Sequence, residues 1–204
     1  MNVINGKRGW MKMRDKYMKQ LENLNNNMIE MGAMIEKSIE NAISALVRQD
    51  VETAKKAIEY DAEIDEMEKN IENMCMKILL SQQPVASDLR TVSSALKMVT
   101  DMERIGDHAA DISEITIMMA DKPYRCKLEK IEKMAKETMI MLVQSIESYV
   151  NKDIEKAKAV INHDDIVDGL FDEVKKALIV AIKDDDEDGE QMADLLMVAK
   201  YLER

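Results

Sequence analysis

The chain has 204 residues, enough for one or two domains with a substantial core. Its 40 acidic residues outnumber 29 basic ones, and the resulting net charge of −11 argues against a nucleic-acid-binding protein, which needs cationic contacts with phosphate. Six glycines, two prolines and 3% aromatic residues are too few for a β-sandwich or barrel, so we expect an all-α protein.

The cysteines and the apolar runs indicate the compartment. Cys75 and Cys126 form no paired motif, which argues against a disulfide framework or a zinc ribbon and favours a reducing compartment. The apolar run Ala177–Ile182 is far shorter than a membrane span, which needs about 20 residues. The opening MNVINGKRGW lacks the apolar centre of a signal peptide. We therefore expect a soluble cytoplasmic protein without a membrane span.

Helical periodicity begins at Met13, so residues 1–12 are predicted to form a flexible tail, the alternative being a wrongly assigned start of the chain. Breaks are expected at Pro84, at Pro123 and in the acidic run Asp184–Asp188. Asp50 and Asp153 occupy positions typical of helix N-caps. These signals predict six helices, over residues 15–48, 51–82, 86–120, 124–151, 154–183 and 189–204.

The chain contains an internal repeat. DVETAKKAIEYDAEID (Asp50–Asp65) aligns with DIEKAKAVINHDDIVD (Asp153–Asp168), and LKMVTDMER (Leu96–Arg104) aligns with LMVAKYLER (Leu196–Arg204). We predict two tandem, pseudo-symmetric three-helix bundles, over 13–121 and 122–204. The second is expected to be incomplete, because the chain ends part-way along the last predicted helix without a cap or breaker.

Acidic residues continue the apolar stripes of two predicted helices. Apolar residues recur at spacings of three and four along helix 51–82 and along the helix that follows it. Where each stripe would continue, the sequence instead has Asp61 and Asp65 on the first helix and Glu103 and Asp107 on the second.

The same four acids are also placed symmetrically about the turn between the two helices. Asp65 and Glu103 are equally distant in sequence from Pro84, and so are Asp61 and Asp107. Antiparallel helices bring such pairs to one level, here about 25 Å from the turn at 1.5 Å per residue. We therefore expect up to four carboxylates to gather between the two helices.

The second repeat has a related set, with Asp164 and Asp168 on one helix and Glu203 on the last. Asp168 and Glu203 average to a position inside the predicted acidic turn. Corresponding helices in the two repeats therefore carry acids on their core stripes. Acid pairs four apart, such as Glu36 with Glu40, usually lie on solvated faces, so the spacing alone does not indicate a metal site.

Partly buried carboxylates at one level repel one another and lose hydration, so a cation is expected to compensate them. An all-oxygen donor set suits Fe³⁺, Mn²⁺, Mg²⁺ or Ca²⁺, and bridging carboxylates favour multinuclear iron. His108 and His163 are next to acids of the two sets and can add nitrogen ligands, but a solvated or hydrogen-bonded side chain is the favoured interpretation.

Three segments together resemble the PhoU family of phosphate-signalling regulators. They are the LNNxxxEMG pattern at Leu24–Gly32, QQPVASDLR at Gln82–Arg90, and ALKMVTDMERIGDHAADISEI at Ala95–Ile115. The resemblance extends over residues 13–204, with a weaker second copy. It departs from the family where Asp111 replaces an asparagine, and at the missing end of the second repeat.

The resemblance implies two pseudo-symmetric three-helix bundles that bind iron or other divalent metal clusters through E/DxxxD motifs. It also implies a cytoplasmic adaptor without catalytic turnover, which negatively regulates the phosphate regulon. The implied partners are the ATPase subunit of the phosphate ABC transporter, a phosphate sensor histidine kinase and a second copy in a homodimer. Any peripheral association with the membrane is expected to run through these partners.

Two other interpretations remain. A carboxylate-bridged di-metal enzyme or iron store of the ferritin-like class normally uses Glu-x-x-His motifs, and no such spacing precedes His108 or His163. The second interpretation is an accessory protein of a different kind of phosphate permease, which would also act in phosphate uptake.

Overall fold

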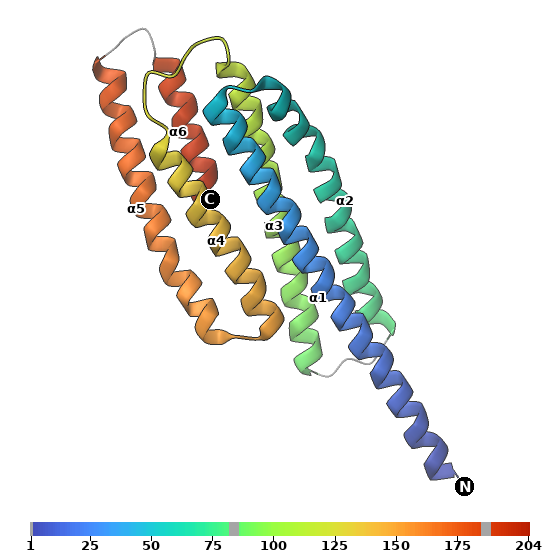
Figure 1. The fold of residues 1–204 in the computed structure, drawn as a ribbon. Coiled ribbons are helices and arrows are strands. Elements are labelled where there is room, and N and C mark those ends of the chain that lie inside the picture. Colours follow the sequence, from blue (N-terminus) through green and yellow to red (C-terminus); the bar gives the residue numbers. More distant parts are fainter. Residues whose placement is uncertain (1, 82–85, 185–188) are drawn as a thin grey trace.

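The computed structural model describes residues 2–81, 86–184 and 189–204 and confirms the all-α class (Figure 1). Within those residues the chain forms six helices. They are α1 (Asn2–Arg48), α2 (Val51–Ser81), α3 (Ala86–Met119), α4 (Glu129–Asn151), α5 (Ile154–Asp184) and α6 (Gly189–Glu203). No helix that the structure describes is long and apolar enough to cross a membrane.

The first connection in each half has the same local chemistry. Gln49 and Lys152 adopt positive φ angles of 51° and 54°, which end α1 and α4. The Asp50 carboxylate accepts hydrogen bonds from the backbone N–H groups of Glu52 and Thr53, both at 3.1 Å. Asp153 likewise caps α5. Both predicted N-caps are confirmed, and each satisfies N–H groups that the helix start would leave unpaired.

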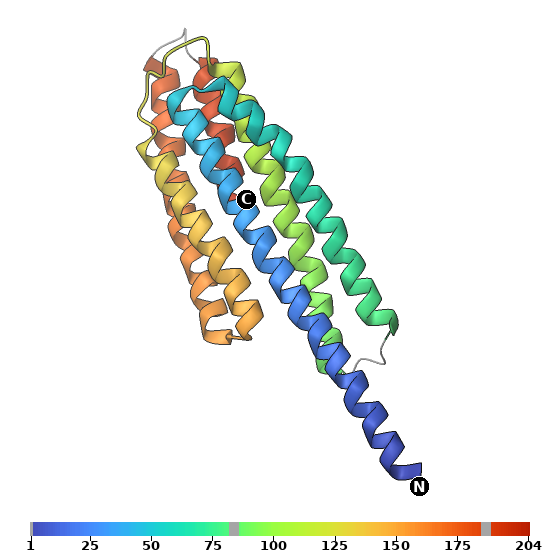
Figure 2. The ribbon, with the colours of Figure 1, turned by 45° about the vertical axis from the view of Figure 1, so that its right-hand side comes forward.

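The six helices form two bundles of three that pack side by side (Figures 1 and 2). Helices α1, α2 and α3 contact one another, as do α4, α5 and α6, and the halves meet where α1 contacts α4 and α3 contacts α6. The core is contiguous across both halves, because fully or nearly fully buried side chains come from every helix: Leu24, Met31, Ile64, Ile112, Met134, Val167 and Leu195.

The structure differs from the sequence prediction at the start of the chain. Residues 2–12 continue α1 as helix, where a flexible tail was predicted, and Figure 1 shows this end projecting beyond the bundle. Once a helix is nucleated by packing, each further residue adds one hydrogen bond, and no proline interrupts the chain before Pro84.

The fourth helix also differs, since it begins at Glu129 rather than near residue 124. Helix α3 already ends at Met119, and the connection that follows is held by α6, where the Gln191 side-chain oxygen accepts a hydrogen bond from the Arg125 N–H. The predicted breaks at Pro84 and over 185–188 lie outside the described residues.

Candidate metal centre

The antiparallel helices α2 and α3 bring carboxylates from both of them together, as the spacing about the turn predicts. Oxygen atoms of Asp61, Asp65 and Asp107 all lie within 4.8 Å of one another, and all three side chains are half-buried. Four residues separate Asp61 from Asp65, so both lie on one face of α2. Opposite them, Asp107 follows the apolar stripe of α3.

A glycine allows the two helices to approach closely at this level. Gly106 is buried, and a Cβ atom added there would lie 3.0 Å from Ile64 Cγ2 and 3.4 Å from Asp61 Oδ1. A side chain at this position would therefore occupy space that α2 uses. Because Gly106 has no side chain, Asp61 of α2 can lie close to the backbone of α3, next to Asp107.

The electrostatics of the group favour a proton or a cation. Burial, and next the charges of Asp107 and Asp65, raise the pKa of Asp61 to about 6. Burial and the charge of Asp65 also raise the pKa of Asp107. Asp61 Oδ1 is buried, and no hydrogen-bond donor meets it. Either a proton shared with Asp107 or a positive ion must compensate this oxygen.

The raised pKa predicts how the stability of the metal-free protein depends on pH. Between about pH 4 and pH 6 the folded state retains the Asp61 proton that the unfolded state releases, so the free energy of unfolding falls as pH rises through this window. Asp61→Asn should therefore stabilise the metal-free protein at pH 7 by about 1–2 kcal/mol, after allowance for solvent screening.

Urea unfolding in the presence of a chelator, at pH 4.5 and pH 7, measures this effect. The stabilisation should shrink at the lower pH, where wild-type Asp61 is itself protonated. An equal gain at both pH values would contradict the titration and point to a pH-independent packing effect.

Three further acids lie around the group: Glu103 and Asp111 of α3, and Glu68 of α2. Burial, and next the charge of Asp107, raise the pKa of Glu103. The charge of Asp111 contributes to the raised pKa values of Asp61 and Asp107. The candidate centre is therefore bounded by carboxylates along both helices.

Glu68 is the member of this group that sequence analysis missed. Burial, and then the charges of Glu72 and Asp65, raise its pKa. It follows Asp65 by three residues and Asp61 by seven, a spacing that puts all three on one helical face. This spacing is visible in the sequence, but acids with similar spacing are common on solvated helix faces, so the spacing did not identify Glu68 as part of the group.

Neither histidine joins the carboxylates. The His108 ring lies 4.9 Å from the Tyr201 ring, and its Nδ1 is 3.5 Å from Asp111 Oδ2. His163 Nε2 contacts Glu137 Oε2 of α4 at 2.7 Å. His163 is therefore hydrogen-bonded, as the favoured interpretation expects. His108 is not, because both of its ring nitrogens are buried without a hydrogen-bond partner in the described structure.

The acids of the second repeat are placed differently. Asp164 and Asp168 are exposed on α5, and Glu203 pairs with Lys200 within α6. Asp164 and Glu203 both line a cavity of about 320 Å³ between the two halves, together with apolar side chains of α3 and α4. Among the residues that the structure describes, no group of three acids combines Asp164, Asp168 and Glu203.

The first set, by contrast, fits a hard cation. It offers carboxylate oxygens from two facing helices, includes a buried oxygen without a donor, and contains neither cysteine nor imidazole. The Lys69 Nζ atom lies 3.6 Å from Asp65 Oδ2, but an exposed ion pair of this kind contributes little compensation.

Comparisons with known proteins agree with this architecture. A family model described as "PhoU domain" matches residues 28–116 and 131–204. A "phosphate-specific transport system accessory protein PhoU homolog" of Clostridium acetobutylicum is 36% identical over 90% of this chain and 84% of its own length. A protein of Aquifex aeolicus with the same description is 33% identical over 93% and 86%.

A solved structure is similar as well. The crystal structure of PhoU from Pseudomonas aeruginosa superposes with a TM-score of 0.87 at 26% identity, covering 92% of this chain and 90% of that one.

Proposed function

This chain belongs to the PhoU family, and we propose that it is a negative regulator of phosphate signalling and uptake. In this proposal it acts as a metal-binding cytoplasmic adaptor between the ATPase subunit of the phosphate ABC transporter and a phosphate sensor histidine kinase. The observation that carries the proposal is the match to the PhoU domain in both halves of the chain.

The role is that of an accessory protein of phosphate transport rather than of an enzyme. The relatives in Clostridium acetobutylicum and Aquifex aeolicus are described as accessory proteins of the phosphate-specific transport system. The Glu-x-x-His pairs expected of a ferritin-like di-metal enzyme are absent from the sequence, and the two histidines contact Asp111 and Glu137.

Metal binding is proposed for the carboxylates of α2 and α3. Asp61, Asp65, Glu103 and Asp107 would hold iron or another hard divalent metal, and Glu68 lies close enough to contribute charge. When bound, the metal would neutralise the repulsion among these groups and fix α2 against α3. The protein's own residues position the oxygens, and Gly106 keeps the helices close.

For the acids of the second repeat we propose individual metal ligands only, not an assembled site. Asp164, Asp168 and Glu203 do not converge within the described residues, so a metal there would need further ligands. We also propose a homodimer, as the family resemblance implies.

The regulatory role predicts a phenotype. Deletion of the gene should raise expression of a phosphate-starvation reporter in phosphate-rich medium, because the adaptor that signals sufficiency would be absent. Reporter activity is compared with wild type and with a strain complemented in trans.

Unchanged expression after deletion would overturn the regulatory proposal. Complementation with an Asp61→Asn/Asp107→Asn variant separates the metal from the role, because full repression by a stable variant without metal would reject only the metal requirement.

A further inference from the structure

The charge of the chain is strongly divided along its length. Residues 1–20 contain six lysines and arginines and one acid, a net charge of +5. The remaining residues therefore carry −16, since the whole chain carries −11. A basic segment at one end of an acidic protein concentrates positive potential there, because distant charges are screened beyond a Debye length of about 10 Å at 0.1 M salt.

The structure places this segment at the free end of the first bundle. Helix α1 projects there, past the end of α2 and the beginning of α3 (Figure 1). Arg14, Lys16 and Lys19 are exposed, whereas Tyr17 between them is buried and anchors the helix. Tyr17 belongs to the hydrophobic core, and α1 contacts both α2 and α3, so the three helices are packed together in this bundle.

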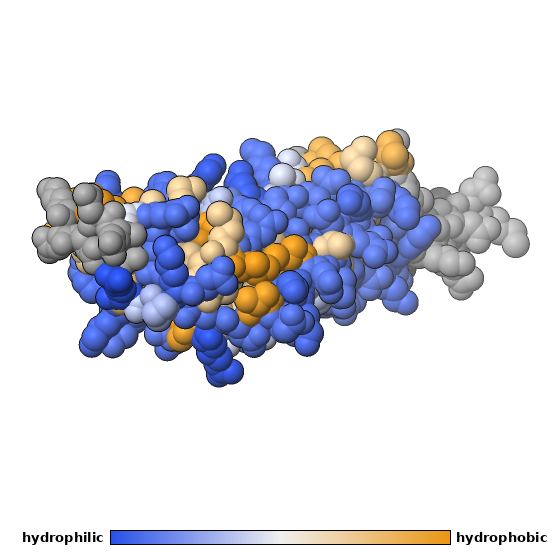
Figure 3. Space-filling model, turned by 90° about the horizontal axis from the view of Figure 1, so that it is seen from above, coloured by the Kyte–Doolittle hydropathy of each residue, from blue (hydrophilic) through white to orange (hydrophobic). Residues whose placement is uncertain are grey.

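The same end exposes large apolar side chains. Leu80, near the end of α2, is 81% exposed, and Met18 of α1 is 56% exposed. Met76 and Leu89 are also exposed, and the cationic residues Lys77 and Arg90 adjoin them in sequence. Figure 3 shows a mostly hydrophilic face on which hydrophobic side chains gather near the middle and again toward the right-hand side.

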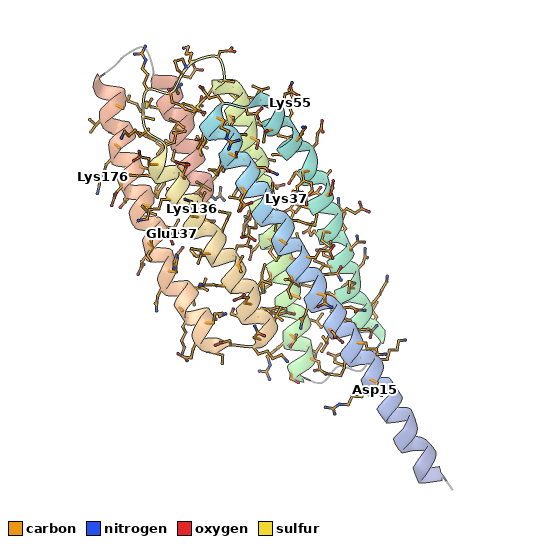
Figure 4. The ribbon with its side chains drawn as sticks, in the orientation of Figure 1. Asp15, Lys37, Lys55, Lys136, Glu137 and Lys176 are labelled. Atoms are coloured by element: carbon orange, nitrogen blue, oxygen red, sulfur yellow. The ribbon has the colours of Figure 1, made fainter. Side chains whose placement is uncertain are left out.

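We infer that this end of the bundle, formed by residues 14–19 of α1, the last turns of α2 and the first turns of α3, binds the surface of an anionic lipid bilayer. Exposed leucine and methionine side chains can enter the headgroup region while neighbouring lysines and arginines contact lipid phosphates. Acids also lie at this end, since Asp15, labelled in Figure 4, is exposed and Glu72 and Asp88 are half-buried. They are outnumbered by exposed cationic residues: Arg14, Lys16, Lys19, Lys77 and Arg90.

Charge complementarity favours a bilayer over an acidic protein partner. The cationic and apolar groups occupy the tip of an elongated bundle, which can meet an extended anionic surface while the acidic body is held away from it. This inference is independent of the metal centre and of the proposed adaptor partners.

Co-sedimentation of the full chain with phosphatidylcholine vesicles, with and without phosphatidylglycerol, tests the inference. We expect binding to the anionic vesicles that weakens at high salt. Arg14→Gln/Lys16→Gln/Lys19→Gln should lower the partition coefficient about a hundredfold, at roughly fivefold for each cationic residue. Leu80→Gln should also weaken binding, because it removes an exposed apolar contact without disturbing the core.

The matched control is Lys55→Gln/Lys56→Gln/Lys136→Gln, which changes net charge equally on exposed residues away from this end; Figure 4 labels Lys55 and Lys136 there. Circular dichroism establishes that each variant is folded, and Leu80→Gln provides the test if the α1 triple variant is not.

Three results would overturn the inference. They are equal binding to neutral and anionic vesicles, equal loss in the control variant, and retention on cell membranes without binding to protein-free vesicles. The last result would identify a protein receptor.

Discussion

Replacing Asp61 and Asp107 with asparagine is expected to abolish metal binding in the first bundle. The double substitution keeps the side-chain shapes but removes two of the three carboxylates whose oxygens lie within 4.8 Å of one another. Metal content after purification without chelators, and calorimetric titration of the chelated protein with Mn²⁺ or Fe²⁺, measure the loss.

The same substitution should also remove the thermal stabilisation that metal gives. A metal at a hundred times its dissociation constant contributes about 2.7 kcal/mol to folding, which corresponds to a rise in Tm of roughly 5–11 °C for a chain of this size. The variant should show no such rise, although without metal it should be at least as stable as wild type at pH 7, because mutual repulsion is relieved.

Two controls make the result specific. Glu36→Gln/Glu40→Gln also removes two charges, from acids of α1 that have the spacing of Asp61 and Asp65, and should leave metal binding unchanged. Asp164→Asn/Asp168→Asn tests the second repeat, whose acids are exposed and do not converge. Loss of metal in either control, or full retention by Asp61→Asn/Asp107→Asn, would contradict the assignment of the centre to α2 and α3.

The level of the centre could be predicted because helices have a constant rise. Residues equidistant from a turn meet across antiparallel helices, and acids on an apolar stripe must face the neighbouring helix. Asp61 and Asp107 satisfy both conditions, and the structure brings them together. The caps at Asp50 and Asp153 were predictable for a similarly local reason, since a short acidic side chain before a helix satisfies its free N–H groups.

Features that depend on tertiary contacts were not predictable in the same way. Glu68 has the spacing of a surface acid pair, and its membership of the group depends on the tilt and depth of α2. In the second repeat, the matching pattern does not produce a matching cluster, because Asp168 lacks a facing acid from α6 in the described structure. A repeated motif predicts a repeated helix more reliably than a repeated site.

The glycine between the helices is another such feature, and it leads to a prediction about stability. Gly106→Ala should lower the free energy of unfolding by about 1 kcal/mol. The new Cβ would meet Ile64 Cγ2 at 3.0 Å and Cδ1 at 3.1 Å, and Ile64 is fully buried. Such overpacking costs about 1–3 kcal/mol, partly offset by roughly 1 kcal/mol from alanine's higher helix propensity.

Gly169→Ala in α5 is the matched control, because nothing lies within 4 Å of the position its Cβ would occupy. It should gain up to about 1 kcal/mol from propensity alone, so urea unfolding should separate the two alanine variants by about 2 kcal/mol. A double-mutant cycle locates the clash. Ile64→Ala alone should cost about 2–4 kcal/mol, and combining it with Gly106→Ala should cost less than the sum, because the truncated side chain makes room for the added methyl group. Strict additivity, or a gain in Gly106→Ala equal to that of Gly169→Ala, would show that close approach at Gly106 does not limit the packing of α2 against α3.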